Sequence, residues 1–180
     1  DRGAQVTLLT GPVHIVPPQG VELVPVASTQ SLYDAMLARC GEQDIIVQAA
    51  APADYRVEHP AAQKLKKRGG EPLTLTLVEN PDIARAVGER KQPGQVLVGF
   101  AAETQNVLEN ARGKLLSKHL DLIVANDVTA KGAGFGTDTN IVTLISNGGT
   151  ETLPLMSKRE VAHRIWDAAL ALRNAEHAGQ

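Results

Sequence analysis

The stretch "AAAPADYRVEHPAAQKLKK", residues 49–67, combines one aspartate with a cluster of lysines. Asp54 follows an apolar run, and Lys64, Lys66 and Lys67 stand within four positions of one another. A carboxylate can hold a divalent cation, and lysines on a flexible connector can close over phosphate oxygens as point charges. A turn followed by a solvated charge run would also explain these residue types. A metal-bound polyphosphate is the simplest target for the combination.

Further polar side chains stand where apolar runs end. Glu103 closes "GFAAE", and Asn126 with Asp127 closes "LIVAND". In open α/β sheets ligands bind outside the carboxyl ends of the strands, so these positions are candidates for ligand contact. Each could instead cap a helix or form a turn.

Two more lysines, Lys114 and Lys118, are four residues apart and therefore share one face of a predicted helix. That face lies beside the apolar stripe formed by Leu108, Ala111 and Leu115. The pair could hold an anion, or it could be a solvated flank of the helix.

The sequence motifs of other nucleotide-binding, nucleophilic and metal sites are absent or incomplete. "GAGFG", residues 132–136, approaches a dinucleotide fingerprint, but Thr137 stands at the third glycine position and a strand-like run follows. Neither a GxxxxGK[ST] loop nor a GxSxG elbow is present, and Cys40 lies on an apolar helix face. The histidines show no metal-ligand spacing.

The elements that must position these groups alternate between strand and helix. Apolar runs predict strands at residues 5–10, 21–26, 44–50, 73–79, 95–102 and 120–127. Such runs suit a parallel sheet that is buried on both faces. Helical periodicity at 31–40, 81–91 and 105–119 predicts a Rossmann-like, doubly wound, mostly parallel α/β sheet with helices on both faces.

The last third of the chain follows another pattern. Residues 141–155 carry "NGG" between two strand-like runs, which predicts an antiparallel hairpin. An amphipathic helix follows, and Ser157 with Glu160 matches a capping box at its start. Residues 55–72 have no clear period, which is typical of a disordered segment or a functional flap.

Composition narrows the function further. Eighteen Lys and Arg against twenty Asp and Glu give a net charge of -2, so no global basic field favours nucleic acid or a membrane as partner. No apolar run is long enough to span a bilayer, no signal-peptide pattern is visible, and a single cysteine excludes an intramolecular disulfide framework. We therefore expect a cytoplasmic protein.

Short motifs taken in order resemble one known family. "AAPADYR", "KLKK", "VENPDIA", "VGFAAET", "LDLIVANDV" and "GFGTDTN" are similar to motifs of phosphopantothenate-cysteine ligases, the synthetase half of the bifunctional coenzyme A biosynthesis proteins of bacteria. The resemblance covers residues 1–173. It implies that 4'-phosphopantothenate attacks the α-phosphate of CTP to give an acyl cytidylate, from which L-cysteine displaces CMP. Mg²⁺ accompanies the nucleotide, and FMN belongs only to a fused decarboxylase half.

The resemblance also assigns residues. Asp54 is expected to share the metal with the nucleotide phosphates, and Lys64 to be the catalytic flap lysine. The positions expected to bind CTP are Gln48, Ala49, Ala50, Asp54, Lys64, Pro81, Asp82, Ile83, Ala84, Phe100, Lys114 and Lys118.

The sequence departs from the family in two places. Pro52 stands where the family usually has an apolar residue, and the family's glycine-rich "GGT" and "SSGKMG"-like segments are expected upstream of Asp1. We therefore expect one ligase domain at 1–175, with its first β–α unit missing, a flap at 55–72 and a tail at 176–180. This chain alone is expected to be inactive.

Assembly and the competing functions complete the expectations. The family usually forms a homodimer through the hairpin and glycine-rich region, and a native fusion to a flavin-dependent decarboxylase would fit it. The alternatives are a non-catalytic, nucleotide-binding domain of a larger flavoprotein and an NAD-type oxidoreductase.

Overall fold

The computed structural model describes residues 2–67, 69–103, 107–127 and 136–178. The chain forms two compact units, one made of residues 1–35 and 52–82 and the other of residues 36–51 and 83–180. The second unit contains the larger sheet and most of the buried core.

The five-stranded sheet of the second unit has the order β10-β9-β7-β6-β3. Its parallel part consists of β3 (Ile45–Gln48), β6 (Val96–Glu103) and β7 (Leu122–Asp127). Next to β7, β9 (Val142–Ser146) runs antiparallel, and β10 (Gly149–Thr152) completes the predicted hairpin. The doubly wound class and the attached hairpin are thereby confirmed.

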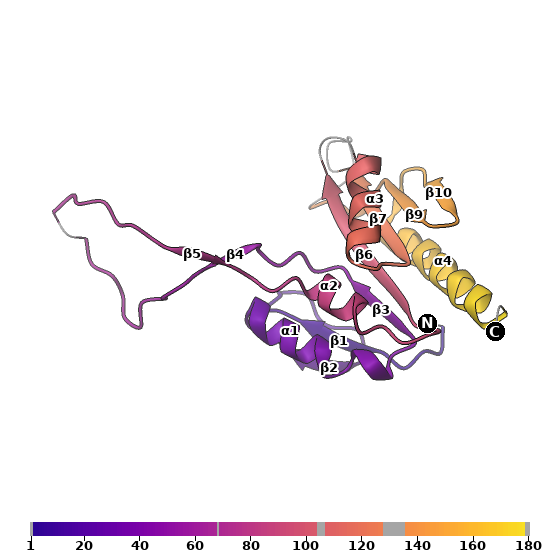
Figure 1. Cartoon of the computed structure of the whole chain (residues 1–180), viewed down its shortest axis with the longest axis horizontal. Coiled ribbons are helices and arrows are strands. Elements are labelled where there is room, and N and C mark those ends of the chain that lie inside the picture. The colour runs from indigo at the N-terminus through magenta and orange to yellow at the C-terminus, as the bar shows by residue number, and fades with distance from the viewer. Residues whose placement is uncertain (1, 68, 104–106, 128–135, 179–180) are drawn as a thin grey trace. The chain divides into compact units, whose positions relative to one another are not determined.

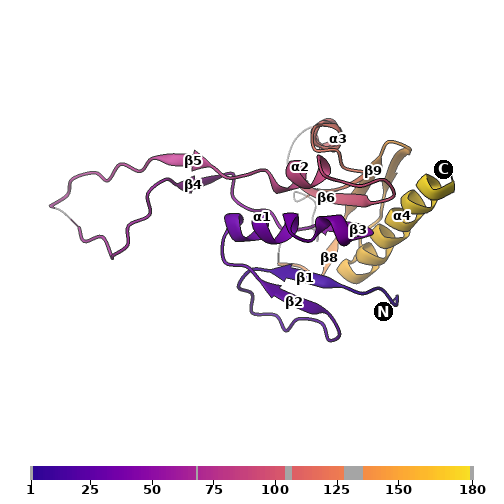
Figure 2. The same cartoon turned by 60° about the horizontal axis from the view of Figure 1, so that its bottom comes forward.

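Both faces of this sheet are covered, which explains why the strands are apolar throughout. On one face Val96, Val98, Leu122 and Val124 belong to a core cluster with residues of α4 (Lys158–Ala178), including Ile165. On the other face α3 (Val107–Ser117) packs against β6 and β7. Figures 1 and 2 show α3 and α4 on opposite sides of the strands. Because successive strand residues point to opposite faces, continuous apolar sequence is needed here.

The amino ends of β6 and β7 are joined by a carboxylate. Asp121 accepts a hydrogen bond from the backbone N–H of Leu97 at 2.7 Å and forms an ion pair with Lys91. The two charged side chains are only 17% and 18% exposed, so this pair is largely shielded from water.

Short elements complete the second unit. The 3-10 turn η1 (Cys40–Glu42) carries the buried Cys40, and α2 (Ile83–Gly88) precedes β6. The strands β8 (Thr139–Asn140) and β11 (Met156–Ser157) pair antiparallel. At the start of α4, Ser157 and Glu160 exchange the hydrogen bonds of the predicted capping box.

The first unit has two small sheets of its own. The parallel pair is formed by β1 (Thr7–Thr10) and β2 (Glu22–Pro25). The helix α1 (Thr29–Leu37) follows, and its residues up to Ala35 belong to this unit. The antiparallel pair, β4 (Tyr55–Val57) and β5 (Leu77–Glu79), forms the base of the flap. The chain between these two strands extends away from them in both views (Figures 1 and 2).

Three expectations are corrected. The run at 73–79 is not a buried strand of the parallel sheet, because only β5 forms there, it pairs with β4, and Leu77 is 55% exposed. Leu108 does not belong to the buried stripe of α3, since it is 49% exposed while Ala111 and Leu115 are buried. The helix predicted at 31–40 ends at Leu37, and the buried Cys40 belongs to the separate turn η1.

Candidate functional site

The carboxyl ends of three parallel strands meet at one edge of the larger sheet. There β3 ends at Gln48, β6 at Glu103 and β7 at Asp127. Ala49 and Ala50 leave the sheet directly after Gln48, and their small side chains allow a ligand to approach the backbone. The side chains of Glu103 and Asp127, both candidates from the sequence, lie outside the described part of the structure.

Two side-chain carbonyl oxygens at this edge are buried without a hydrogen-bond partner among the described residues. They are Oε1 of Gln48, on the last residue of β3, and Oδ1 of Asn126, near the end of β7. An unsatisfied buried acceptor costs about 1–3 kcal/mol, so such groups commonly mark a position where a ligand or water supplies the donor. Sequence interpretation singled out Asn126 as a polar strand end but did not place it among the binding residues.

The alignment of the strands places these two acceptor oxygens on opposite faces of the sheet. Gln48 is aligned with Gly99 of β6, whereas Asn126 is aligned with Ala102, three residues further along the same strand. Residues three apart in a strand point to opposite faces. A ligand that reaches both oxygens must therefore lie across the ends of the strands.

The apolar candidates divide into exposed and buried groups. Phe100, in β6, keeps 39% of its surface exposed, so its ring is accessible for stacking. Ile83 and Ala84, the first residues of α2, are only 2% and 6% exposed. Their side chains belong to the core, and a ligand can reach these two positions only through the backbone.

The lysine pair lies at the carboxyl end of α3. Lys114 lies in the last turn of α3 and Lys118 just after its end, and both are half-buried. The stems of such side chains can pack on apolar surface while the ammonium groups stay in water. In this position they can contribute positive charge on the α3 side of the sheet.

The flap of the first unit carries the remaining charged candidates. Asp54 directly precedes β4 and is exposed, and Lys64 is exposed in the segment that joins β4 to β5. Pro81 and Asp82 follow this ribbon. Within this unit, the antiparallel pairing brings Asp54 close to the residues just before Pro81, because Asn80 donates its backbone N–H to the carbonyl of Asp54 at 2.7 Å.

The described residues contain no group of three or more His, Cys, Asp and Glu side chains that could enclose a metal ion. A magnesium ion bound through nucleotide phosphates needs only one or two carboxylates from the protein, so Asp54 alone fits that mode. In the described residues no helix is both long and apolar enough to cross a membrane.

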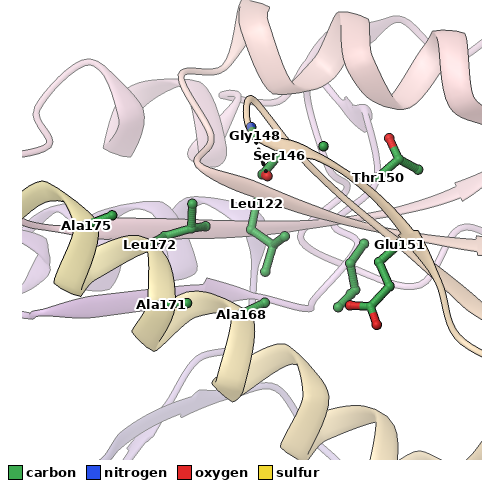
Figure 3. Close-up of a pocket in the computed structure, with 11 residues that line it drawn as sticks. Leu122, Ser146, Gly148, Thr150, Glu151, Ala168, Ala171, Leu172 and Ala175 are labelled. Atoms are coloured by element: carbon green, nitrogen blue, oxygen red, sulfur yellow. Dashed lines mark hydrogen bonds between the residues drawn. The ribbon is translucent and has the colours of Figure 1, made fainter.

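A hollow of about 400 Å³ lies elsewhere, between α4 and the hairpin (Figure 3). Leu122, at the amino end of β7, lines it together with Ala168 and Leu172. It is therefore at the opposite end of β7 from Asn126. Its one charged lining residue, Glu151, is already paired with Arg164, and the hollow contains no group suited to the chemistry considered above.

Fold and site together define an open α/β protein with polar groups gathered at the carboxyl ends of its parallel strands. The chain belongs to the family described as DNA/pantothenate metabolism flavoprotein C-terminal domain, which matches residues 1–172. The resemblance inferred from the sequence motifs is thereby confirmed at the level of the family.

The relatives agree with this assignment. The chain is 46% identical over 172 residues to the coenzyme A biosynthesis bifunctional protein CoaBC of Bacillus subtilis, covering 94% of this chain and 42% of that protein. It is 43% identical over 164 residues to the protein of the same name from Vibrio parahaemolyticus, covering 91% and 41%. The chain thus spans less than half the length of these relatives.

A solved structure supports the same fold. The crystal structure of the C-terminal domain of a coenzyme A biosynthesis bifunctional protein CoaBC is 36% identical and superposes with a TM-score of 0.75, covering 92% of this chain and 72% of that one. A DNA/pantothenate metabolism flavoprotein from Streptococcus pneumoniae has the same TM-score at 22% identity, which shows the shared fold alone.

Proposed function

We propose that this chain is a domain of a CTP-dependent phosphopantothenate-cysteine ligase that acts in coenzyme A biosynthesis. The observation that carries the proposal is the 46% identity, over nearly the whole chain, to a protein named for coenzyme A biosynthesis. The polar carboxyl edge of the sheet supports it, because a nucleotide-dependent ligase needs donors and acceptors gathered at one place.

The proposed reaction has two steps. The carboxylate of 4'-phosphopantothenate attacks the α-phosphorus of CTP, the bond to the β-phosphate breaks, and acyl cytidylate and pyrophosphate form. The amine of L-cysteine then attacks the acyl carbon, the bond to CMP breaks, and the nitrogen loses a proton as the amide forms. Negative charge moves onto the leaving phosphate in both steps.

The chain's own residues would stabilise and orient these groups. Lys64 would cover the phosphates from the flap, and Lys114 with Lys118 would add positive charge from α3. Phe100 would contribute an apolar contact, and the positions Gln48 to Ala50 and Pro81 to Ala84 would line the nucleotide site. The unpartnered oxygen of Asn126 adds an acceptor for a hydroxyl, amine or amide of a substrate, a role that the motif comparison did not include.

Magnesium would be held between the nucleotide phosphates and Asp54. It would neutralise phosphate charge and polarise the phosphoryl group. A flavin has no role in this reaction, and we assign FMN to a separate decarboxylase half of the kind that the bifunctional relatives suggest.

The proposal includes partners that the whole protein would need. The relatives are named as bifunctional and are more than twice as long as this chain, so a fused decarboxylase fits the proposal. A homodimer formed by the hairpin and glycine-rich region fits it as well. The second candidate function, a non-catalytic, nucleotide-binding domain of a larger flavoprotein, fits the same difference in length.

The proposal is tested by calorimetric titration of the chain with CTP and with ATP in magnesium. We expect heat that is selective for CTP and an affinity lower by a factor of about ten to a hundred in Lys64→Gln, since losing one charge-assisted contact costs about 1.5–3 kcal/mol. Lys67→Gln, in the same flap, is the matched control and should change the affinity less.

The outcomes separate the parts of the proposal. Equal heats with ATP and CTP would refute the nucleotide assignment. Equal effects of the two lysine variants would refute the specific role of Lys64. If this chain gives no heat but a longer polypeptide containing it forms the amide, nucleotide binding needs residues outside this chain. CTP binding by a longer polypeptide that forms no amide would favour the second candidate function. No heat and no amide formation from either polypeptide would overturn the ligase proposal.

A further inference from the structure

Asn80 follows β5 and holds the backbone on both sides of the Asp54 Cα atom. Its backbone N–H donates to the carbonyl of Asp54 at 2.7 Å, and its side-chain Nδ2 donates to the carbonyl of Ala53 at 2.8 Å. These two carbonyls flank the Asp54 Cα. Together the bonds restrict the backbone dihedral angles of Asp54 and therefore the direction of its Cα–Cβ bond, from which the carboxylate extends.

The amide of Asn80 is itself fixed in orientation. Its Oδ1 accepts a hydrogen bond at 3.4 Å from Nη1 of Arg56, and the same Nη1 donates to the carbonyl of Glu79. With Oδ1 facing Arg56 and Nδ2 facing Ala53, both ends of the side chain have partners, so a flipped amide would lose both bonds.

The sequence explains why a side chain is used at this point. Pro81 follows Asn80 and has no N–H, so the chain cannot offer a further backbone donor there. The Nδ2 group supplies an additional donor just beyond the β4–β5 pairing. An asparagine before a helix is often an N-cap, but here Oδ1 accepts from Arg56.

The residues that form these hydrogen bonds are largely exposed, so the bonds affect local conformation more than the stability of the fold. Ala53, Asp54 and Arg56 are exposed and Asn80 is half-buried, so the bonds compete with water. Hydrogen bonds in such positions add little to the free energy of folding. Their main physical effect is therefore local: they limit the conformations of an otherwise exposed aspartate at the base of a long ribbon.

We propose that Asn80 is a positioning residue that holds the Asp54 carboxylate in the orientation it needs to receive the metal–nucleotide complex. This inference rests on the proposed role of Asp54 in nucleotide binding. It gives the asparagine of "ENPD" a function that is separate from the contacts assigned to Pro81 and Asp82.

The first test needs no nucleotide. In NMR measurements on the chain, Asn80→Ala should lower the backbone order parameter of Asp54 from about 0.85 to below about 0.6, while the amides of β4 and β5 stay ordered. Arg56→Gln leaves the Nδ2 bond in place and should have a smaller effect. An unchanged order parameter at Asp54 in Asn80→Ala would overturn the proposal.

The second test is a double-mutant cycle on the affinity for magnesium–CTP, measured by calorimetry. Asn80→Ala should weaken binding about five- to tenfold when Asp54 is present and have almost no effect in an Asp54→Ala background, because residues that act as a unit are not additive. The midpoint of thermal unfolding should move by only a few degrees. Equal losses in both backgrounds would mean that Asn80 does not act through Asp54.

Failure of the proposed function gives a different pattern. If Asp54→Ala binds magnesium–CTP as well as the wild type does, the nucleotide role of Asp54 is wrong, and so is the functional part of this inference. The loss of order in Asn80→Ala would then remain as a structural effect alone. If nothing binds, the order parameter decides whether Asn80 orients Asp54.

Discussion

Asn126→Leu should make the protein more stable and a poorer ligand binder at the same time. The Oδ1 atom of Asn126 is buried at the carboxyl end of β7 and has no partner among the described residues. Leucine has nearly the same shape, and replacing an unsatisfied buried polar group with an apolar one of the same shape is neutral or stabilising. We expect a gain of about 1 kcal/mol in the free energy of unfolding, the lower end of the cost of an unmet acceptor.

The same substitution should weaken binding, because the acceptor would be lost from the proposed ligand site. One neutral hydrogen bond contributes about 0.5–1.5 kcal/mol, which corresponds to an affinity lower by a factor of about two to ten. Urea denaturation, with and without magnesium–CTP, measures both effects, since a ligand that binds only the folded state adds to its stability.

The matched control is Asn140→Leu. The Oδ1 atom of Asn140 accepts a hydrogen bond from the backbone N–H of Ile141 at 3.0 Å, so this substitution removes a satisfied acceptor. It should destabilise the chain by about 1 kcal/mol and leave nucleotide affinity unchanged. If Asn126→Leu destabilised the chain as much as the control and bound nucleotide normally, the Asn126 oxygen would have an ordinary structural role.

Three further substitutions test internal contacts of the second unit. Asp121→Ala should lower the free energy of unfolding by about 2–4 kcal/mol in urea denaturation, because it leaves the buried N–H of Leu97 without its acceptor and breaks the shielded ion pair with Lys91. The control Glu151→Ala should lower it by less than about 1 kcal/mol, because the ion pair of Glu151 with Arg164 is exposed. Similar losses in the two variants would contradict the argument from burial. The pKa of Glu160 lies below its usual 4.5, first because its carboxylate accepts from the Ser157 hydroxyl and second because it accepts from the Ser157 N–H. A lowered folded-state pKa gives stability that is present above about pH 4.5 and is lost as the pH falls through the folded value. Ser157→Ala should therefore raise the pKa of Glu160 toward 4.5 in an NMR titration; no change would show that the capping box does not set it.

The larger sheet could be predicted from the sequence because its parallel strands are continuous apolar runs. The runs that became β3, β6 and β7 are apolar on consecutive residues, which only a strand buried on both faces requires. The run at 73–79 has similar content, but its leucines alternate with threonines, and Leu75 is 53% exposed in the flap. That alternation indicates a strand with only one apolar face, and this distinguishes the run from the strands of the parallel sheet despite its similar proportion of apolar residues.

The candidate site could be predicted only by residue type. Lysines and an aspartate are recognisable as possible phosphate and metal ligands in any sequence, whereas the burial of a single oxygen on Gln48 or Asn126 depends on how distant elements pack around it. For the same reason the contact between Asn80 and Ala53 could not be read from residues 27 positions apart in the chain. Motif resemblance could name positions but could not show how a neighbour orients them.

The chemistry of the edge in the second unit matches a ligand that carries both acceptors and donors. Phosphate oxygens only accept hydrogen bonds, so they can be bound by the ammonium groups of Lys114 and Lys118 but not by the carbonyl oxygens of Gln48 and Asn126. Those oxygens require N–H or O–H groups. A nucleotide or a phosphopantothenate meets both requirements in one molecule, with phosphates at one end and hydroxyls, amines or amides at the other. Inorganic pyrophosphate alone should therefore compete with the nucleotide only weakly, while cytidine without phosphates should retain the part of the binding energy that Asn126→Leu removes.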